Sequence, residues 1–92
     1  MPLTRGQFLG HDNLRLAFGF TMYDGEILVE CQISDAAMDA LAGVTGTLSI
    51  ARQAQFLSHR DEIERIASDL FDSPRHVRST VVRIFTKHIP PR

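Results

Sequence analysis

The chain has 92 residues, enough for a single domain with one hydrophobic core and too few for two stable domains. Apolar residues make up 43% and charged residues 23%, proportions that exclude an intrinsically disordered chain. One cysteine, Cys31, excludes an internal disulfide, and no apolar run is long enough for a membrane-spanning helix. Residues 1–7 lead into no signal-peptide core, so the expected location is the cytoplasm.

The net charge of −1 conceals an uneven distribution. Residues 1–72 hold all eleven acidic residues and five of the ten Lys and Arg residues, which leaves a charge of −6. Residues 73–92 hold no acid and five basic residues: Arg75, Arg78, Arg83, Lys87 and Arg92. Such a basic segment is typical of a chain that contacts an anionic partner, or that docks on its own acidic part.

Residues 1–12 leave two alternatives open, a short edge strand or a segment lying across the core. The next stretch has the period-two pattern of a half-buried strand, with apolar residues at alternate positions: Leu14, Leu16, Phe18 and Phe20. Residues 21–25 end in Asp24-Gly25 and predict a turn, because glycine adopts positive φ at little cost. A second alternating run follows, with one apolar face: Ile27, Val29, Cys31 and Ile33. The two runs predict a β-hairpin.

Two helices are expected next. Ser34 stands at an N-cap position and Gly43 at a terminating position, which predicts a helix of about two turns between them. A longer amphipathic helix is predicted from Ser49 to Asp72, with its apolar residues in one sector: Phe56, Ile63, Ala67 and Leu70. His59 and Arg60 interrupt the apolar side of this helix near its middle.

Residues 74–89 support two interpretations. Ser73-Pro74 and a helical spacing of apolar residues favour a helix. A high density of β-branched residues favours a strand, and we predict a strand that ends at Pro90-Pro91. The expected fold is therefore a single α+β domain over residues 1–92 with the order β-β-α-α-β. Its small antiparallel sheet comprises the hairpin and the C-terminal strand, and two helices pack on one face.

Two stretches carry a family resemblance. One is the strand Gly25 to Ser34 running into Ala37-Met38-x-x-Leu41, and the other is Phe56-x-x-His59-Arg60-x-x-Ile63-x-x-x-Ala67. Together they resemble the small bacterial family of domain of unknown function 1488, over roughly Leu14 to Phe71. The resemblance implies a compact α+β fold with a hairpin, two helices and a closing strand. It implies no activity, cofactor or partner, and the N-terminal segment and basic tail depart from the family pattern.

Arg60 is the first candidate for a functional residue. Its position near Phe56 on the helix implies partial burial, and a buried guanidinium must be paired. Arg60 could border a pocket for a small anionic ligand together with His59. The alternative, which we favour, is a structural arginine that pairs with one of three glutamates: Glu64, Glu30 or Glu26.

The sequence contains no catalytic, cofactor or metal signature. A Cys31–His59 pair lacks a third group that would orient it, and a cysteine between Val29 and Ile33 is typical of a core. The four histidines are too scattered for metal-ligand spacing: His11, His59, His76 and His88. Neither a glycine-rich phosphate loop nor a nucleophile elbow is present.

The basic segment is the second candidate. Its residues Arg75, Arg78, Arg83 and Lys87 could contact nucleic-acid phosphates, although Phe85 is the only aromatic residue among them. We therefore expect a non-enzymatic interaction or accessory module, which could form a homodimer through an exposed sheet edge. Weak nucleic-acid binding through the basic segment is the alternative, and an anionic-ligand pocket near Arg60 is the third hypothesis.

Overall fold

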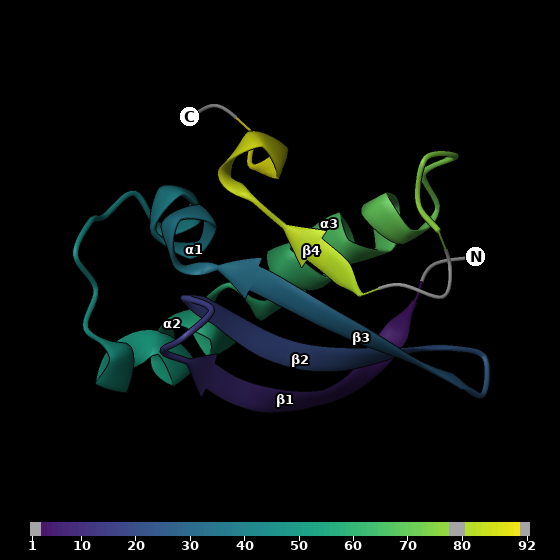
Figure 1. Ribbon diagram of the computed structural model, residues 1–92, viewed down its shortest axis with the longest axis horizontal. Coiled ribbons are helices and arrows are strands. Elements are labelled where there is room, and N and C mark those ends of the chain that lie inside the picture. The colour runs from purple at the N-terminus through teal and green to yellow at the C-terminus, as the bar shows by residue number, and fades with distance from the viewer. Residues whose placement is uncertain (1–2, 78–80, 91–92) are drawn as a thin grey trace.

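The computed structural model describes residues 3–77 and 81–90. Its elements follow one another in this order: β1 (Thr4–Asp12), β2 (Ala17–Asp24), β3 (Ile27–Ser34), α1 (Asp35–Ala42), the 3-10 turn η1 (Ser49–Ala51), α2 (Arg52–Ser58), α3 (Arg60–Phe71), β4 (Val82–Ile84) and the 3-10 turn η2 (Thr86–His88). The predicted α+β class and the order of strands and helices are confirmed (Figure 1). Of the two alternatives for residues 1–12, the strand is present, as β1.

The four strands form one sheet in the order β1-β2-β3-β4. The pairs β1–β2 and β2–β3 are antiparallel, whereas β4 lies parallel to β3 with Cys31 opposite Val82 and Ile33 opposite Ile84. The sheet is therefore mixed rather than wholly antiparallel as expected. The helical segment between β3 and β4 returns the chain to the end where β3 began, and a parallel neighbour requires such a crossover.

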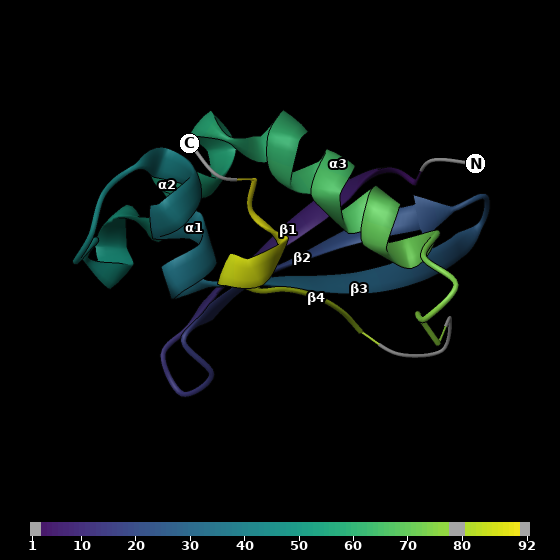
Figure 2. The same ribbon diagram turned by 90° about the horizontal axis from the view of Figure 1, so that it is seen from above.

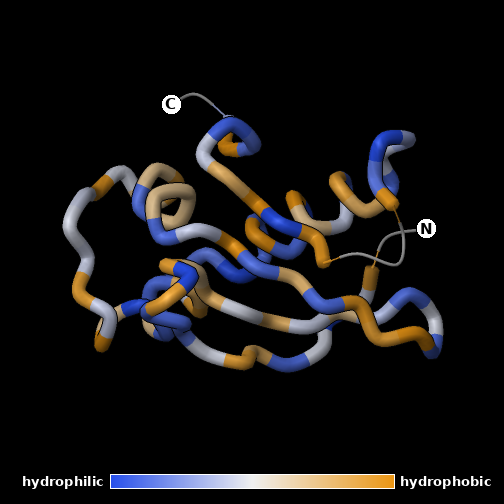
Figure 3. The backbone as a smooth tube through the Cα atoms, in the orientation of Figure 1, coloured by the Kyte–Doolittle hydropathy of each residue, from blue (hydrophilic) through white to orange (hydrophobic). Residues whose placement is uncertain are grey.

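All three helices lie on the same side of the sheet (Figure 2). The strands direct alternate apolar side chains toward them, and the fully buried members include Phe18, Phe20, Cys31 and Ile33. From the helices, Phe56 and other apolar side chains meet this face. Along α3 the chain alternates between hydrophobic and hydrophilic positions (Figure 3), as expected for a helix with one buried side. No helix in the described part of the chain lies on the opposite face of the sheet (Figure 2).

The β1–β2 turn differs from the prediction. Leu14 and Leu16, expected on a half-buried strand, are 96% and 60% exposed, so their predicted burial was wrong. The carboxylate of Asp12 accepts hydrogen bonds from the backbone N–H groups of Leu14 and Arg15, at 2.9 and 3.2 Å, and closes a turn there. Strand β2 then begins at Ala17 and continues to Asp24, where Gly25-Glu26 forms a two-residue turn shorter than predicted.

The helix caps around α1 are as predicted. The Ser34 hydroxyl accepts a hydrogen bond from the N–H of Ala37 at 3.1 Å, and Gly43 ends α1 in the left-handed conformation with φ of 72°. The predicted helix from Ser49 to Asp72 is instead divided at His59, whose φ and ψ are −117° and 16°. The N–H of His59 donates to the carbonyl of Phe56 at 3.1 Å, a bond over three residues that tightens and ends α2.

The predicted C-terminal strand is present but short. β4 comprises only Val82–Ile84, and η2 follows it directly, so the strand is much shorter than the span of 74–89 that the β-branched residues suggested. The reason lies in the partner strand: α1 begins at Asp35, directly after β3, and the ladder that β4 forms ends with Ile33 opposite Ile84. The predicted residue Arg78 lies outside the described residues.

Candidate functional site

Arg60 is paired within the protein. Its Nε atom donates to Glu64 at 3.1 Å, and its Nη2 atom donates to the backbone carbonyl of Gly6 at 3.0 Å. The guanidinium carbon lies 5.7 Å from the centre of the Phe56 ring, within cation–π range. Glu64 is thus the partner among the three glutamates considered. Arg5 shares the same carboxylate, which ties β1 to α3 through an Arg–Glu–Arg cluster.

Arg60 and the neighbouring Arg5 are both paired within the protein. A hollow of about 400 Å³ lies there, lined by Arg5, Leu57, Ser58, His59, Arg60, Asp61 and Glu62. Asp61 binds Arg5 at 2.6 Å and Glu64 binds both arginines, so the two arginines of this hollow already have carboxylate partners. An anionic ligand would have to displace these partners, and the local charges therefore do not favour the predicted anionic-ligand pocket around His59 and Arg60.

Cys31 occupies the core. It is fully buried on β3, and burial raises the pKa of its thiol to about 12. A nucleophilic cysteine requires the opposite setting, an exposed thiol with a lowered pKa. The geometry therefore agrees with the interpretation of Cys31 as a small core residue.

A buried polar network links α1, α2 and the loop between them. Arg52, whose side chain is 5% exposed, donates from Nη1 to Asp39 at 2.7 Å and to Gln55 at 2.8 Å. Asp39 also accepts from the Thr47 hydroxyl at 2.6 Å and from the Gln55 amide at 2.9 Å. Burial opposes the ionisation of Asp39, but these bonds from Thr47, Arg52 and Gln55 outweigh it and hold the pKa of Asp39 at about 2.

The same network continues to β1. Asp35 lies 3.7 Å from Nε of Arg52, and both of its carboxylate oxygens lie 3.0 Å from Nε2 of His11. A carboxylate–imidazole pair can serve catalysis when it activates a nucleophile. Within residues 3–77 and 81–90, however, no hydroxyl or thiol is hydrogen-bonded to the His11 ring. The network of side chains that runs from His11 through Asp35 and Arg52 to Asp39 therefore holds β1, α1 and α2 together.

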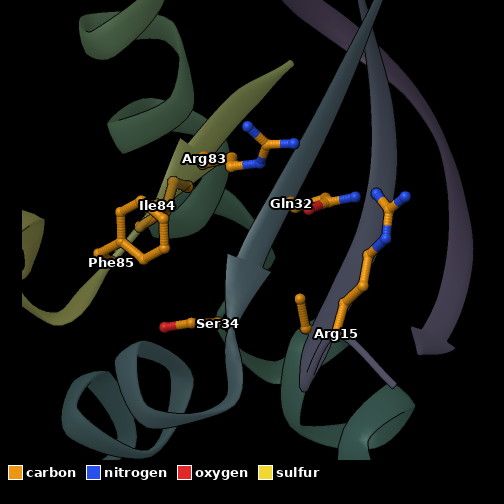
Figure 4. A pocket seen from close by; sticks show the side chains of 7 residues that line it. Arg15, Gln32, Ser34, Arg83, Ile84 and Phe85 are labelled. Carbon is orange, nitrogen blue, oxygen red and sulfur yellow. The ribbon is translucent and has the colours of Figure 1, made fainter. Parts of the chain in front are cut away.

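The open face of the sheet carries a second hollow, of about 290 Å³, between the β1–β2 turn and β4 (Figure 4). Its lining residues are Arg15, Ala17, Gln32, Ser34, Arg83, Ile84 and Phe85. In this view the guanidinium groups of Arg15 and Arg83 lie on either side of the Gln32 amide. Gln32 and Arg83 are paired neighbours on β3 and β4, which explains why their side chains leave the sheet on the same face.

The two arginines of this hollow are weakly engaged. The Arg83 side chain forms no hydrogen bond or ion pair with any residue in the described part of the chain, and Arg83 is exposed. The Arg15 guanidinium lies 3.8 Å from Asp12, and both of these side chains are largely exposed. Exposed pairs of this kind contribute little, typically below about 1 kcal/mol. Both guanidinium groups are therefore available to an anion, unlike those of Arg52 and Arg60.

Phe85 forms the aromatic border of the hollow. Its side chain is nearly half exposed, and its backbone N–H donates to Nδ1 of His88 at 2.9 Å. Burial and the neighbouring Lys87 lower the pKa of His88, which favours the neutral imidazole that can accept this bond. The two rings lie 6.0 Å apart, so His88 braces Phe85 at the end of β4.

A larger hollow of about 500 Å³ adjoins this one on the same face. It shares Arg15, Ala17 and Gln32, and it adds Gly10 and Gly19, which have no side chains to fill the space. It also contains two acidic residues, Asp12 and Glu30. The open face thus has a cationic end near β4 and an acidic end near β1.

Of the basic residues predicted to act together that the structure describes, Arg83 alone lines the hollow. Lys87 is exposed on η2, and Arg75 is exposed in the turn after α3. Figures 1 and 2 show that this turn and η2 lie apart. Sequence reasoning overlooked Arg15, because nothing in the sequence relates the β1–β2 turn to a strand 68 residues later.

Two further properties concern the described residues alone. Among them, no three His, Cys, Asp or Glu side chains gather as they would around a metal ion. In the same part of the chain, no helix has the length and apolar character needed to cross a membrane.

Comparison with known proteins gives two matches. The model of the family described as "Protein of unknown function (DUF1488)" matches residues 7–82. The crystal structure of a protein of unknown function from the DUF1488 family of Shewanella loihica PV-4 is 20% identical, with a TM-score of 0.71 over 85% of this chain and 89% of that chain. At this identity the similarity shows a shared fold alone. No curated protein is significantly similar to the chain.

Replacing Arg52 with Met tests the buried network. The variant leaves the Asp39 carboxylate buried without its cation, and we expect the free energy of unfolding to fall by about 3–5 kcal/mol. Arg65→Met is the matched control, since Arg65 is 68% exposed and 4.0 Å from Glu62, and its effect should stay within about 0.5 kcal/mol. Urea denaturation measures the free energy of unfolding of both variants. If Arg52→Met lowers it no more than Arg65→Met does, the structural role of Arg52 is contradicted.

The lowered pKa of Asp39 predicts an acid-sensitive contribution to stability. The carboxylate is ionised in the folded protein with a pKa of about 2, below its ordinary value of 3.8. Its stabilisation, on the order of 2 kcal/mol, is present above about pH 4 and is lost as the pH falls toward 2. Urea denaturation between pH 5 and 2 should show a steeper loss for the parent protein than for Asp39→Asn; identical slopes would refute the assignment.

Proposed function

The chain belongs to the DUF1488 family of proteins of unknown function, and we propose that it is a non-enzymatic interaction module that binds an anionic group on the open face of its sheet. The observation that carries the proposal is the hollow between Arg15 and Arg83. Two guanidinium groups without strong partners border it, and the Gln32 amide lies between them.

The burial of the other charged groups supports this choice of surface. The buried arginine Arg52 and the largely buried Arg60 are each matched to carboxylates by short bonds, so neither can accept an external anion without loss of internal bonds. At Arg15 and Arg83 an anion displaces little more than water. Charge-assisted bonds from guanidinium to phosphate or carboxylate are among the strongest hydrogen bonds that proteins form.

The non-enzymatic character rests on the chemistry of the described side chains. The only thiol is buried with a raised pKa, and the His11 imidazole is held by Asp35 and close to Arg52 without a bonded nucleophile. The open-face hollow offers cations, an amide and a ring, which bind and orient a ligand. It offers no general base within its lining.

Weak nucleic-acid binding is the second candidate. The presence of Arg15 beside Arg83, with the exposed ring of Phe85 at the same hollow, favours it, because single-strand binders combine cations with a stacking ring. Asp12 and Glu30 on the same face oppose the continuation of a phosphate backbone toward β1. We therefore rank this candidate below binding of a small anionic group.

A homodimer through a sheet edge is a further arrangement of the same module. β1 carries irregularities between Arg5 and Phe8 and between Phe8 and Gly10, and β4 has three residues. Bulged and very short edge strands are features that discourage edge-to-edge pairing. We therefore place the interaction on the open face rather than at the edges.

Titration with inorganic phosphate at low salt, followed by amide NMR shifts, tests the primary proposal. We expect shifts grouped around Arg15, Gln32 and Arg83, and about tenfold weaker binding in Arg83→Gln, the loss of one hydrogen bond to a charged group. Arg75→Gln is the control, because Arg75 is exposed outside the hollow. Equal affinity in the parent and Arg83→Gln would remove the proposal.

The salt dependence of binding to a single-stranded oligonucleotide tests the second candidate. If Arg75, Arg78, Arg83 and Lys87 all contact phosphates, the logarithm of affinity should fall with the logarithm of salt concentration with a slope of about −2.8. If only Arg15 and Arg83 act, the slope should be about −1.4. Anisotropy of a labelled oligonucleotide measures this slope. If Arg83→Glu leaves the affinity for the oligonucleotide unchanged, the nucleic-acid candidate is contradicted.

A further inference from the structure

The open-face hollow has two chemically different parts, a cationic part at Arg83 and an aromatic part at Phe85, only two positions apart in the sequence. Arg83 and Phe85 are separated by Ile84, whose side chain is buried in the core. Phe85 has the extended φ and ψ of −114° and 170°, so the strand alternation continues past the end of β4. Arg83 and Phe85 therefore point to the same side of the chain, roughly 6–7 Å apart along it. A ligand that spans them must combine an anionic group with a flat ring.

The anionic part of the ligand would lie between the guanidinium groups. Arg15 and Arg83 approach the hollow from opposite sides in Figure 4, one from the β1–β2 turn and the other from β4. A phosphate has three terminal oxygens and can accept bonds from two planar guanidinium forks at once. This arrangement suits a doubly charged phosphate better than a single carboxylate.

The ring would stack on Phe85. β4 ends at Ile84, and the next residue, Phe85, is 46% exposed. The bond to His88 holds the backbone of Phe85, and the imidazole lies beside the phenyl ring. An exposed but braced aromatic ring offers a stacking surface that needs little ordering when a flat group binds.

Gln32 supplies a polar contact beside the guanidinium groups. Its amide carries both donors and an acceptor, and glutamine can read the edge of a nucleobase through paired hydrogen bonds. The Ser34 hydroxyl at the other end of the hollow already caps α1, so the Gln32 amide is the group that a saturated or purely apolar ring would leave unpaired.

The size and charge of the open face limit the ligand to one nucleotide. The hollow of about 290 Å³ lies at the lower limit for small-molecule sites. Beyond it, the adjoining hollow contains Asp12 and Glu30, which would repel a second phosphate. We propose that the hollow formed by Arg15, Gln32, Arg83 and Phe85 binds a nucleoside monophosphate. This inference rests on the proposed function, since it names the ligand of the same site.

Calorimetric titration with the four nucleoside 5′-monophosphates, inorganic phosphate and adenosine tests the inference. At least one nucleotide should bind about tenfold more tightly than phosphate or adenosine, the order of gain expected from one base–aromatic stack. Phe85→Leu, which keeps an apolar side chain but removes the ring, should abolish this gain and leave the affinity for phosphate unchanged. Arg83→Gln should weaken both phosphate and nucleotide, and Arg75→Gln should weaken neither.

The outcomes separate this inference from the proposed function. If phosphate binds at Arg15 and Arg83 but no nucleotide binds more tightly, the inference fails while the proposed function stands. If neither phosphate nor any nucleotide binds, both fail. Phenyl phosphate serves as the final control: if it binds as tightly as every nucleotide, the nucleoside assignment is overturned. Circular dichroism of each variant confirms that the fold is retained.

Discussion

The contact of Phe56 with the hairpin is the constraint on which the rest of the structure depends. Its ring stacks on Phe18 with centres 4.6 Å apart and lies 5.1 Å from the ring of Phe20. The Arg60 guanidinium lies 5.7 Å from the centre of the Phe56 ring and, through its bond to the carbonyl of Gly6, joins α3 to β1. This packing commits the helices to one face of the sheet, and among the described residues no helix covers the other face.

The elements that sequence patterns predicted are those defined by neighbouring residues. The hairpin was recognisable because alternation along β2 and β3 reflects a single buried face. Helix α1 was recognisable because Ser34 and Gly43 each cap one of its ends through bonds to residues of the adjoining turn. Alternation failed at Leu14 and Leu16, where the hydrogen bonds of Asp12 close a turn. The parallel pairing of β4 had no local signal, since it depends on where the helices return the chain.

The candidate site was only partly predictable for the same reason. Arg83 was recognised from its basic segment, but its companion Arg15 comes from a turn near the other end of the chain. The network around Arg52 was missed because its partner Asp39 lies 13 residues away across a loop. For Arg60, the sequence offered three glutamates, and the partner is Glu64 because a spacing of four residues on a helix places the two side chains together. Charge alone did not distinguish an arginine held internally from one that faces solvent.

The shortness of β4 also affects the energetics of the open face. This strand joins the sheet through only three residues, after an excursion of nearly fifty residues from β3, and it carries Arg83 and leads into Phe85. Short peripheral elements open with lower free energies than the core of a domain, often without global unfolding. When β4 detaches, the hollow ceases to exist, so occupancy of the hollow and docking of β4 are thermodynamically linked. A bound ligand would stabilise the docked state of β4, and the rate at which β4 opens locally would limit the rate of ligand dissociation.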